Sequence, residues 1–145
     1  MAGDLIYWDT CVWLAWLTKQ GDPGHLAALE QFAAEFESGK RTLITSALTR
    51  VEVLQCTLTE QQRENYRLLF KRRNFQEIPI SGAVVDLAHD IRNFYLAKRK
   101  KGDPNPPETP DAIHLATAIK FGAAQFHTFD GGNKPGKKRG LTPLS

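Results

Sequence analysis

The chain has 145 residues, 41% of them hydrophobic and 24% charged, and a net charge of +3, so it is long enough to bury a core and is ordinary in composition for a globular protein. No apolar run approaches the ~20 residues that a membrane-spanning helix needs, and the first residues lack the basic segment that opens a signal peptide. Its two cysteines form no CxxC pair, which predicts free, buried thiols rather than a disulfide framework or a zinc site, and these features together predict a cytoplasmic protein without a membrane partner.

The pattern of apolar residues predicts short strands that alternate with helices, because runs of apolar residues are separated by segments with apolar positions every three or four residues. Such alternation predicts a parallel sheet with helices on both faces, and the absence of repeats or a linker predicts one α/β domain over residues 1–145. Pro79 lies in the third strand and favours an edge position for it. In chain order we expect strands at 5–8, 42–46, 77–80, 124–129 and 141–145, and helices at 10–17, 25–37, 48–56, 59–73, 81–98 and 110–121.

Four acidic side chains fall where such a sheet would bring them to one edge: Asp9, Glu52, Asp111 and Asp130. The first and the last directly follow predicted strands, and the other two lie near the starts of helices. Ligands of open α/β sheets bind outside the carboxyl ends of the strands. Clustered carboxylates repel one another and raise each other's pKa, unless a hard cation neutralises them. The pattern therefore predicts an all-oxygen site for Mg²⁺ or Mn²⁺.

Each of these acids also has a local interpretation. Asp9 is a suitable N-cap for the helix that follows it, and Thr49 with Glu52 matches a capping box. Asp111 in a first helical turn suits the helix dipole, and Asp130 before two glycines suits a turn. Taken singly, these interpretations are at least as good as a metal site. The common position at one sheet edge is what favours the metal site.

Four segments in this order, YWDTCVWL, TSALTRVEVL, PDAIHLATAI and FHTFD, resemble the PIN domain. The resemblance implies a compact α/β/α sandwich with a small central parallel sheet, and a metal-dependent nuclease that hydrolyses phosphodiester bonds of single-stranded RNA. It implies catalytic and metal-binding roles for Asp9, Glu52, Asp111 and Asp130. Thr10 and Thr128 match the hydroxyl residues that lie beside the first and the fourth acid, where they would contact substrate.

Among PIN proteins, a small single-domain chain most resembles the VapC-like ribonuclease toxins. That resemblance implies a homodimer and inhibition by a small antitoxin protein. The segment after Asp130 departs from many relatives, because it is rich in glycine and lysine where they carry a further acid or asparagine. This departure concerns the second metal position more than the first.

The basic residues cluster in three places. Those at 71–73 and 98–101 suit helix ends. The third cluster lies in a glycine- and proline-rich segment after Asp130, where it would hold an RNA strand beside the acids: Lys134, Lys137, Lys138 and Arg139. Three other polar residues receive no catalytic role at this stage. We expect His114 to bond to a neighbour of its helix, and Asp103 and Glu108 to be solvated loop acids.

Two alternatives remain open. The chain could be a non-catalytic RNA- or protein-binding PIN-like module, although such a module need not keep all four acids. It could also be a magnesium-dependent phosphatase, but those folds usually place two aspartates on the first strand as D-x-D. The first strand here ends in WDTC, with Asp9 alone.

Overall fold

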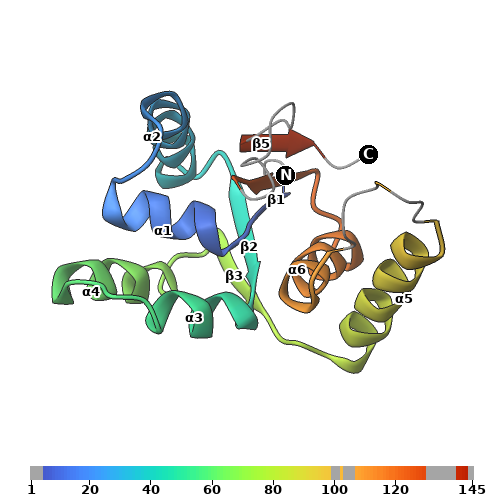
Figure 1. The fold of residues 1–145 in the computed structure, drawn as a ribbon. Coiled ribbons are helices and arrows are strands. Elements are labelled where there is room, and N and C mark those ends of the chain that lie inside the picture. The colour runs from blue at the N-terminus through green and yellow to red at the C-terminus, as the bar shows by residue number, and fades with distance from the viewer. Residues whose placement is uncertain (1–4, 99–101, 103–106, 130–139, 144–145) are drawn as a thin grey trace.

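A computed structural model describes residues 5–98, 102, 107–129 and 140–143 of the chain. Strands and helices alternate along it, as the apolar pattern predicts (Figure 1). Both cysteines are free, as expected, although they are half-buried rather than fully buried. The elements in chain order are β1 (Leu5–Trp8), α1 (Thr10–Thr18), α2 (Pro23–Glu37), β2 (Thr42–Ser46), α3 (Ala47–Leu54), α4 (Glu60–Leu69), β3 (Phe75–Ile78), α5 (Gly82–Lys98), α6 (Thr109–Lys120), β4 (Gln125–Thr128) and β5 (Gly140–Pro143).

The strands form a single sheet in the order β3-β2-β1-β4-β5. The first four are parallel, with Tyr7 of β1 opposite Ile44 of β2 and Phe126 of β4, and β5 runs antiparallel to β4. The sequence therefore predicted the parallel sheet and the edge position of β3 correctly. The third strand begins two residues earlier than predicted and ends before Pro79. The missing N–H of the proline therefore removes no hydrogen bond between strands. The parallel arrangement brings the carboxyl ends of β1, β2 and β4 to one edge.

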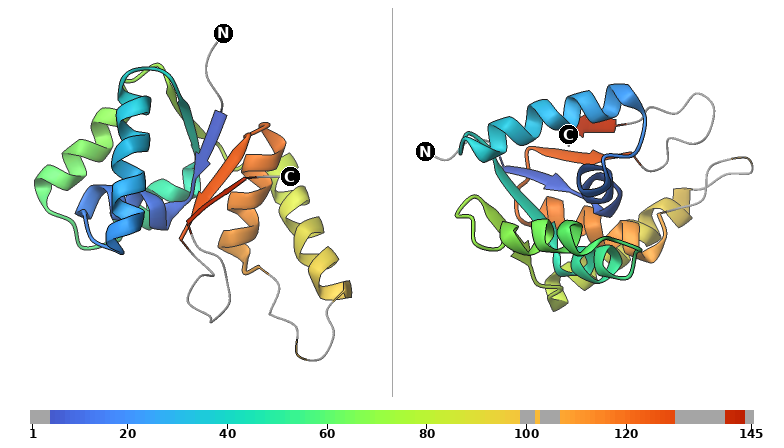
Figure 2. Two further views of the ribbon diagram at one scale, coloured as in Figure 1. Left: turned by 90° about the horizontal axis from the view of Figure 1, so that it is seen from above. Right: turned by 90° about the vertical axis from the view of Figure 1, so that its left-hand side faces the viewer.

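Helices cover both faces of the sheet, as Figures 1 and 2 show. Ile6 and Trp8 of β1 belong to a buried apolar cluster with residues of α1, α2 and α4. Tyr7 lies between them in sequence and packs on the opposite face with Ala118 of α6 and Phe126. The first strand is thus buried on both faces, as strands of a parallel sheet usually are. The result is an α/β/α sandwich.

The outermost helix is α5, which packs against α6 through Val84 and Ala88. An apolar side chain near the carboxyl end of this helix lies in solvent, since Phe94 is 56% exposed. No helix in the part of the chain that the structure describes is long and apolar enough to cross a membrane.

The residues at which α1 and α3 begin determine the positions of the Asp9 and Glu52 side chains. Asp9 is the N-cap of α1, as its local interpretation predicted. The predicted capping box of Thr49 and Glu52 is wrong, because Ser46 caps α3 and the Thr49 hydroxyl lies 2.6 Å from that of Thr45. Glu52 therefore lies inside α3, and its carboxylate takes part in tertiary contacts instead of a cap.

Candidate active site

Asp9 leaves the end of β1 and is almost fully buried, with 6% of its surface exposed. Its Oδ1 accepts a hydrogen bond from the Cys11 thiol at 2.9 Å and a longer one from the Val12 backbone N–H at 3.4 Å. Burial raises the pKa of Asp9, and the hydrogen bonds from Cys11, Thr128 and Val12 offset only part of that effect. A carboxylate in this position is costly to ionise, and a bound cation would lower that cost.

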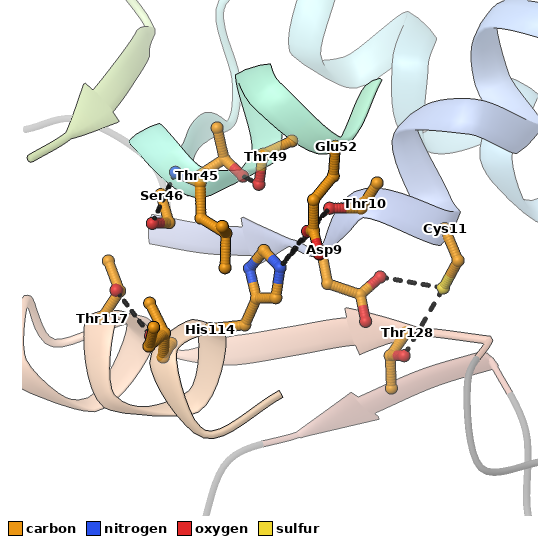
Figure 3. A network of polar contacts seen from close by, with 12 residues as sticks. Asp9, Thr10, Cys11, Thr45, Ser46, Thr49, Glu52, His114, Thr117 and Thr128 are labelled. Carbon is orange, nitrogen blue, oxygen red and sulfur yellow. Dashed lines mark hydrogen bonds and ion pairs between the residues drawn. The ribbon is translucent and has the colours of Figure 1, made fainter. Parts of the chain in front are cut away.

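Cys11 connects Asp9 to the end of β4. Its sulfur lies 3.6 Å from the Thr128 hydroxyl and accepts the backbone N–H of Phe129 at 3.2 Å. Figure 3 shows Asp9 turned toward Cys11 and Thr128. The carboxyl ends of β1 and β4 are thereby held together beside the Asp9 carboxylate. The sequence offered no sign of this thiol's position, because a cysteine in an apolar helix usually packs as a small apolar side chain.

Glu52 reaches the same edge from α3. Its Oε1 accepts the Thr10 hydroxyl at 2.5 Å and the His114 Nε2–H at 2.9 Å. The hydrogen bond from His114 lowers the pKa of Glu52, the one from Thr10 adds to it, and both outweigh the partial burial that opposes them. Because Thr10 directly follows Asp9, the surroundings of the two carboxylates are contiguous (Figure 3).

His114 received no catalytic role from the sequence, but the structure places it beside Glu52 in the candidate site. It is buried, with 4% exposed, one turn before Ala118 on the side of α6 that faces Tyr7 of β1. As expected for a helix histidine it bonds to neighbours, but these neighbours come from β1 and α3 rather than from its own helix. The available signal in the sequence was the spacing, because His114 lies three residues after Asp111 and so near it on the helix surface.

Both ring nitrogens of His114 have buried or half-buried partners. The Tyr7 oxygen accepts the backbone N–H of Ser46 at 3.1 Å and lies 2.5 Å from His114 Nδ1. Burial raises the pKa of Tyr7, so the phenol keeps its proton. The Glu52 carboxylate can only accept a hydrogen bond, so the nitrogen that faces it, Nε2, carries a proton. Tyr7 thus contacts His114, and His114 in turn holds the Glu52 carboxylate.

Asp111 lies half-buried in the first turn of α6, three residues before His114 and therefore on a neighbouring part of the same helix surface. Glu108 occupies the N-cap position of α6 and makes no side-chain cap. Asp103 and Asp130 lie outside the described residues, as does the basic cluster: Lys134, Lys137, Lys138 and Arg139. Within the described residues, no three His, Cys, Asp or Glu side chains are grouped closely enough to hold a metal ion by themselves.

The sequence profile of the PIN domain matches residues 6–133, which span all the elements from β1 to β4 apart from the first residue of β1. The chain belongs to the PIN domain family. A search of curated proteins returned no match. The PIN fold explains why β1, α3, α6 and β4 each bring a polar side chain to the same sheet edge.

Solved structures with the same fold include proteins of toxin–antitoxin systems. One is a chain of a toxin–antitoxin complex from Klebsiella pneumoniae, with 20% identity, a TM-score of 0.58, and coverage of 90% of this chain and 91% of that chain. Another belongs to VapBC2 from Rickettsia felis bound to a promoter DNA fragment, with 15% identity, a TM-score of 0.60, and coverage of 87% and 88%. A third is VapC20 from Mycobacterium tuberculosis, described as a toxin that cleaves the sarcin–ricin loop, with 17% identity, a TM-score of 0.58, and coverage of 87% and 90%. At these identities the similarity concerns the fold of this PIN domain.

Proposed function

We propose that this PIN domain is a metal-dependent endoribonuclease that hydrolyses phosphodiester bonds of single-stranded RNA. The supporting observation is the pair of contiguous carboxylates at the carboxyl edge of the sheet. Asp9 is buried and held by Cys11, and Glu52 is held by Thr10 and His114. Family membership adds the expectation that Asp111 and Asp130 complete the site.

The donor chemistry of this site fits Mg²⁺ or Mn²⁺. Carboxylate oxygens are the ligands that such hard cations prefer, and Mg²⁺ usually binds one or two carboxylates while it keeps several waters. Asp9 is the first candidate ligand, because burial raises its pKa and a cation would favour its ionised form. Asp111 and Asp130 are the next candidates, and Glu52 would contribute directly or through water. When bound, the ion would lower the pKa of a water that it holds and neutralise charge on the attacked phosphate.

The chain's own residues would position the carboxylates and supply no nucleophile. Cys11 is a nucleophilic side chain in direct contact with Asp9. Burial raises the pKa of its thiol, and the neighbouring Asp9 charge raises it further, so the reactive thiolate is disfavoured. Hydrolysis by water is therefore favoured over covalent catalysis. Thr10 and Thr128 remain candidates for contact with the RNA when a metal ion engages the Glu52 and Asp9 carboxylates.

The test is cleavage of end-labelled single-stranded RNA with Mg²⁺, with Mn²⁺ and with EDTA. We expect Asp9→Asn and Asp111→Asn to abolish cleavage and Asp86→Asn, on the exposed side of α5, to leave it unchanged. Purifying all variants in parallel controls for a contaminating ribonuclease. If wild type and Asp111→Asn cut equally, the activity is not that of this site, and a non-catalytic RNA- or protein-binding module becomes the better description.

We further propose a toxin role, inhibition by a small antitoxin, and a homodimer. Support comes from the shared fold with proteins of toxin–antitoxin complexes. Expression of the chain with and without a small protein encoded beside it tests the proposal. We expect growth arrest with the chain alone, relief with the neighbour, and a dimer in light scattering of the purified chain. Growth arrest that persists in Asp9→Asn would contradict a nuclease toxin.

A further inference from the structure

A cavity of about 700 Å³ lies at the same sheet edge and is lined in part by Cys11. Its walls come from one side of α1 along its whole length, the connection between α1 and α2, the first turn of α2, the connection between α3 and α4, and the residue after β4. Leu14, Leu26 and Leu58 form the apolar part of the lining. The volume lies in the range of cavities that bind small molecules, about 300–1,000 Å³.

Cys11 belongs both to the cavity and to the candidate active site. It lines the cavity and donates its thiol hydrogen to Asp9 at 2.9 Å. Phe129 also lines the cavity, and its backbone N–H donates to Cys11 at 3.2 Å. Phe129 directly precedes Asp130 in the sequence. A group bound beside Cys11 in the cavity is therefore separated by that one side chain from the Asp9 carboxylate of the candidate active site.

The lining combines an aromatic pair with polar groups. The rings of His25 and Phe129 are stacked, with centroids 4.5 Å apart and planes 2° apart. Gln20, Asp22 and Thr57 add an amide, a carboxylate and a hydroxyl to the lining. Single-stranded RNA is held by proteins in this way, with bases stacked on aromatic rings and base edges bonded to polar side chains.

The charge of the lining distinguishes a base from a phosphate. No Lys or Arg lines the cavity among the residues that the structure describes, and the Asp22 carboxylate would repel a phosphate group. Asp22 is held in place because its Oδ1 accepts the backbone N–H groups of Gly24 and His25, at 2.8 and 3.2 Å. An uncharged flat group with hydrogen-bonding edges suits these walls better than an anion.

We infer that this cavity binds the base of a nucleotide next to the cleaved phosphodiester. The inference rests on the proposed ribonuclease function and adds a specificity site to it. A base in the cavity fixes where its neighbouring phosphate lies relative to Asp9, so the cavity would select both the position and the sequence of cleavage.

The test replaces single nucleotides around the cleavage site with abasic ribose. We expect one position at which loss of the base lowers kcat/KM roughly tenfold to a hundredfold, because base–aromatic stacking contributes about 1–3 kcal/mol per base. His25→Leu should remove most of that difference, since it keeps an apolar side chain but loses the ring. His89→Leu, at an exposed position on α5, should retain it. Neither residue belongs to the candidate active site.

A second measurement does not need cleavage. RNA with 2-aminopurine at the sensitive position, or at each position in turn if nothing is cut, is titrated with protein in EDTA. Quenching of the base by wild type and His89→Leu, but not by His25→Leu, supports the base site. RNA that is cut equally with and without the base at every position overturns the inference and leaves the nuclease intact. RNA that is not cut with any metal refutes the nuclease, and the absence of quenching then refutes the base site as well. If His25→Leu instead weakens only binding of a small protein partner, the cavity holds a peptide and not a base.

Discussion

Acidification should destabilise this protein through one buried histidine on β4. His127 is fully buried, with 0% exposed, and lies edge-on to the Phe32 ring at 4.9 Å. Its Nδ1 accepts the indole N–H of Trp8 at 2.9 Å, so the ring proton lies on Nε2, which donates to the Gln125 side chain at 2.8 Å. A second proton would have to go onto Nδ1, where it would face the Trp8 N–H. The folded protein therefore holds His127 in its neutral form.

The size of the effect follows from the pKa of His127. Burial lowers it from 6.5 to about 4, and the Arg41 charge contributes a smaller part. The unfolded chain takes up a proton near pH 6.5, whereas the folded chain does so only near pH 4. The stabilising contribution is thus complete above pH 6.5 and is lost as the pH falls from 6.5 to 4. At about 1.4 kcal/mol per pH unit, the total loss is about 3 kcal/mol, a large share of a typical stability of about 5–15 kcal/mol.

Urea unfolding between pH 4 and pH 8, followed by tryptophan fluorescence in EDTA, measures this loss. His127→Asn is the matched control, because its side-chain oxygen can still accept the Trp8 N–H but the residue does not titrate in this range. We expect the free energy of unfolding of the wild type to fall about 3 kcal/mol further than that of the variant. Parallel pH curves for the two proteins would refute the assignment, since other groups would then account for any acid sensitivity.

Three further outcomes are expected. Asp9→Asn should raise Tm in EDTA at neutral pH, because burial raises the pKa of Asp9 and its charge destabilises the fold, while asparagine still caps α1; an unchanged Tm would mean that Asp9 acts only as a cap. Tyr7→Phe should cost about 1–3 kcal/mol, because it leaves the buried Ser46 N–H unpaired, and it should also lower cleavage by freeing His114; full activity would separate His114 from the site. Replacing the basic cluster with alanine should weaken RNA binding, and the difference from wild type should shrink as salt rises; a difference that is constant with salt would contradict phosphate contacts by Lys134, Lys137, Lys138 and Arg139.

Local sequence patterns predict much of the fold. The strand 42–46 is found where the apolar spacing predicts it, and α4 starts next to the predicted position 59, with a capping box of Thr59 and Gln62. The sheet edge that carries Asp9 follows from the alternation of strands and helices, because parallel strands all end at one edge. These features depend on residues close together in sequence. A local pattern of this kind predicts the same helix or strand whatever the rest of the chain contains.

The contacts inside the candidate site depend on residues far apart in sequence, and only the tertiary structure decides them. Thr49 and Glu52 match a capping box by spacing, but Ser46 ends β2 and caps α3 first, so the helix starts earlier and Glu52 is directed toward Thr10 and His114. The partners of Glu52 lie 42 and 62 positions away in sequence. No local rule selects among so many possible partners, because the choice is made by how β1, α3 and α6 pack on the sheet.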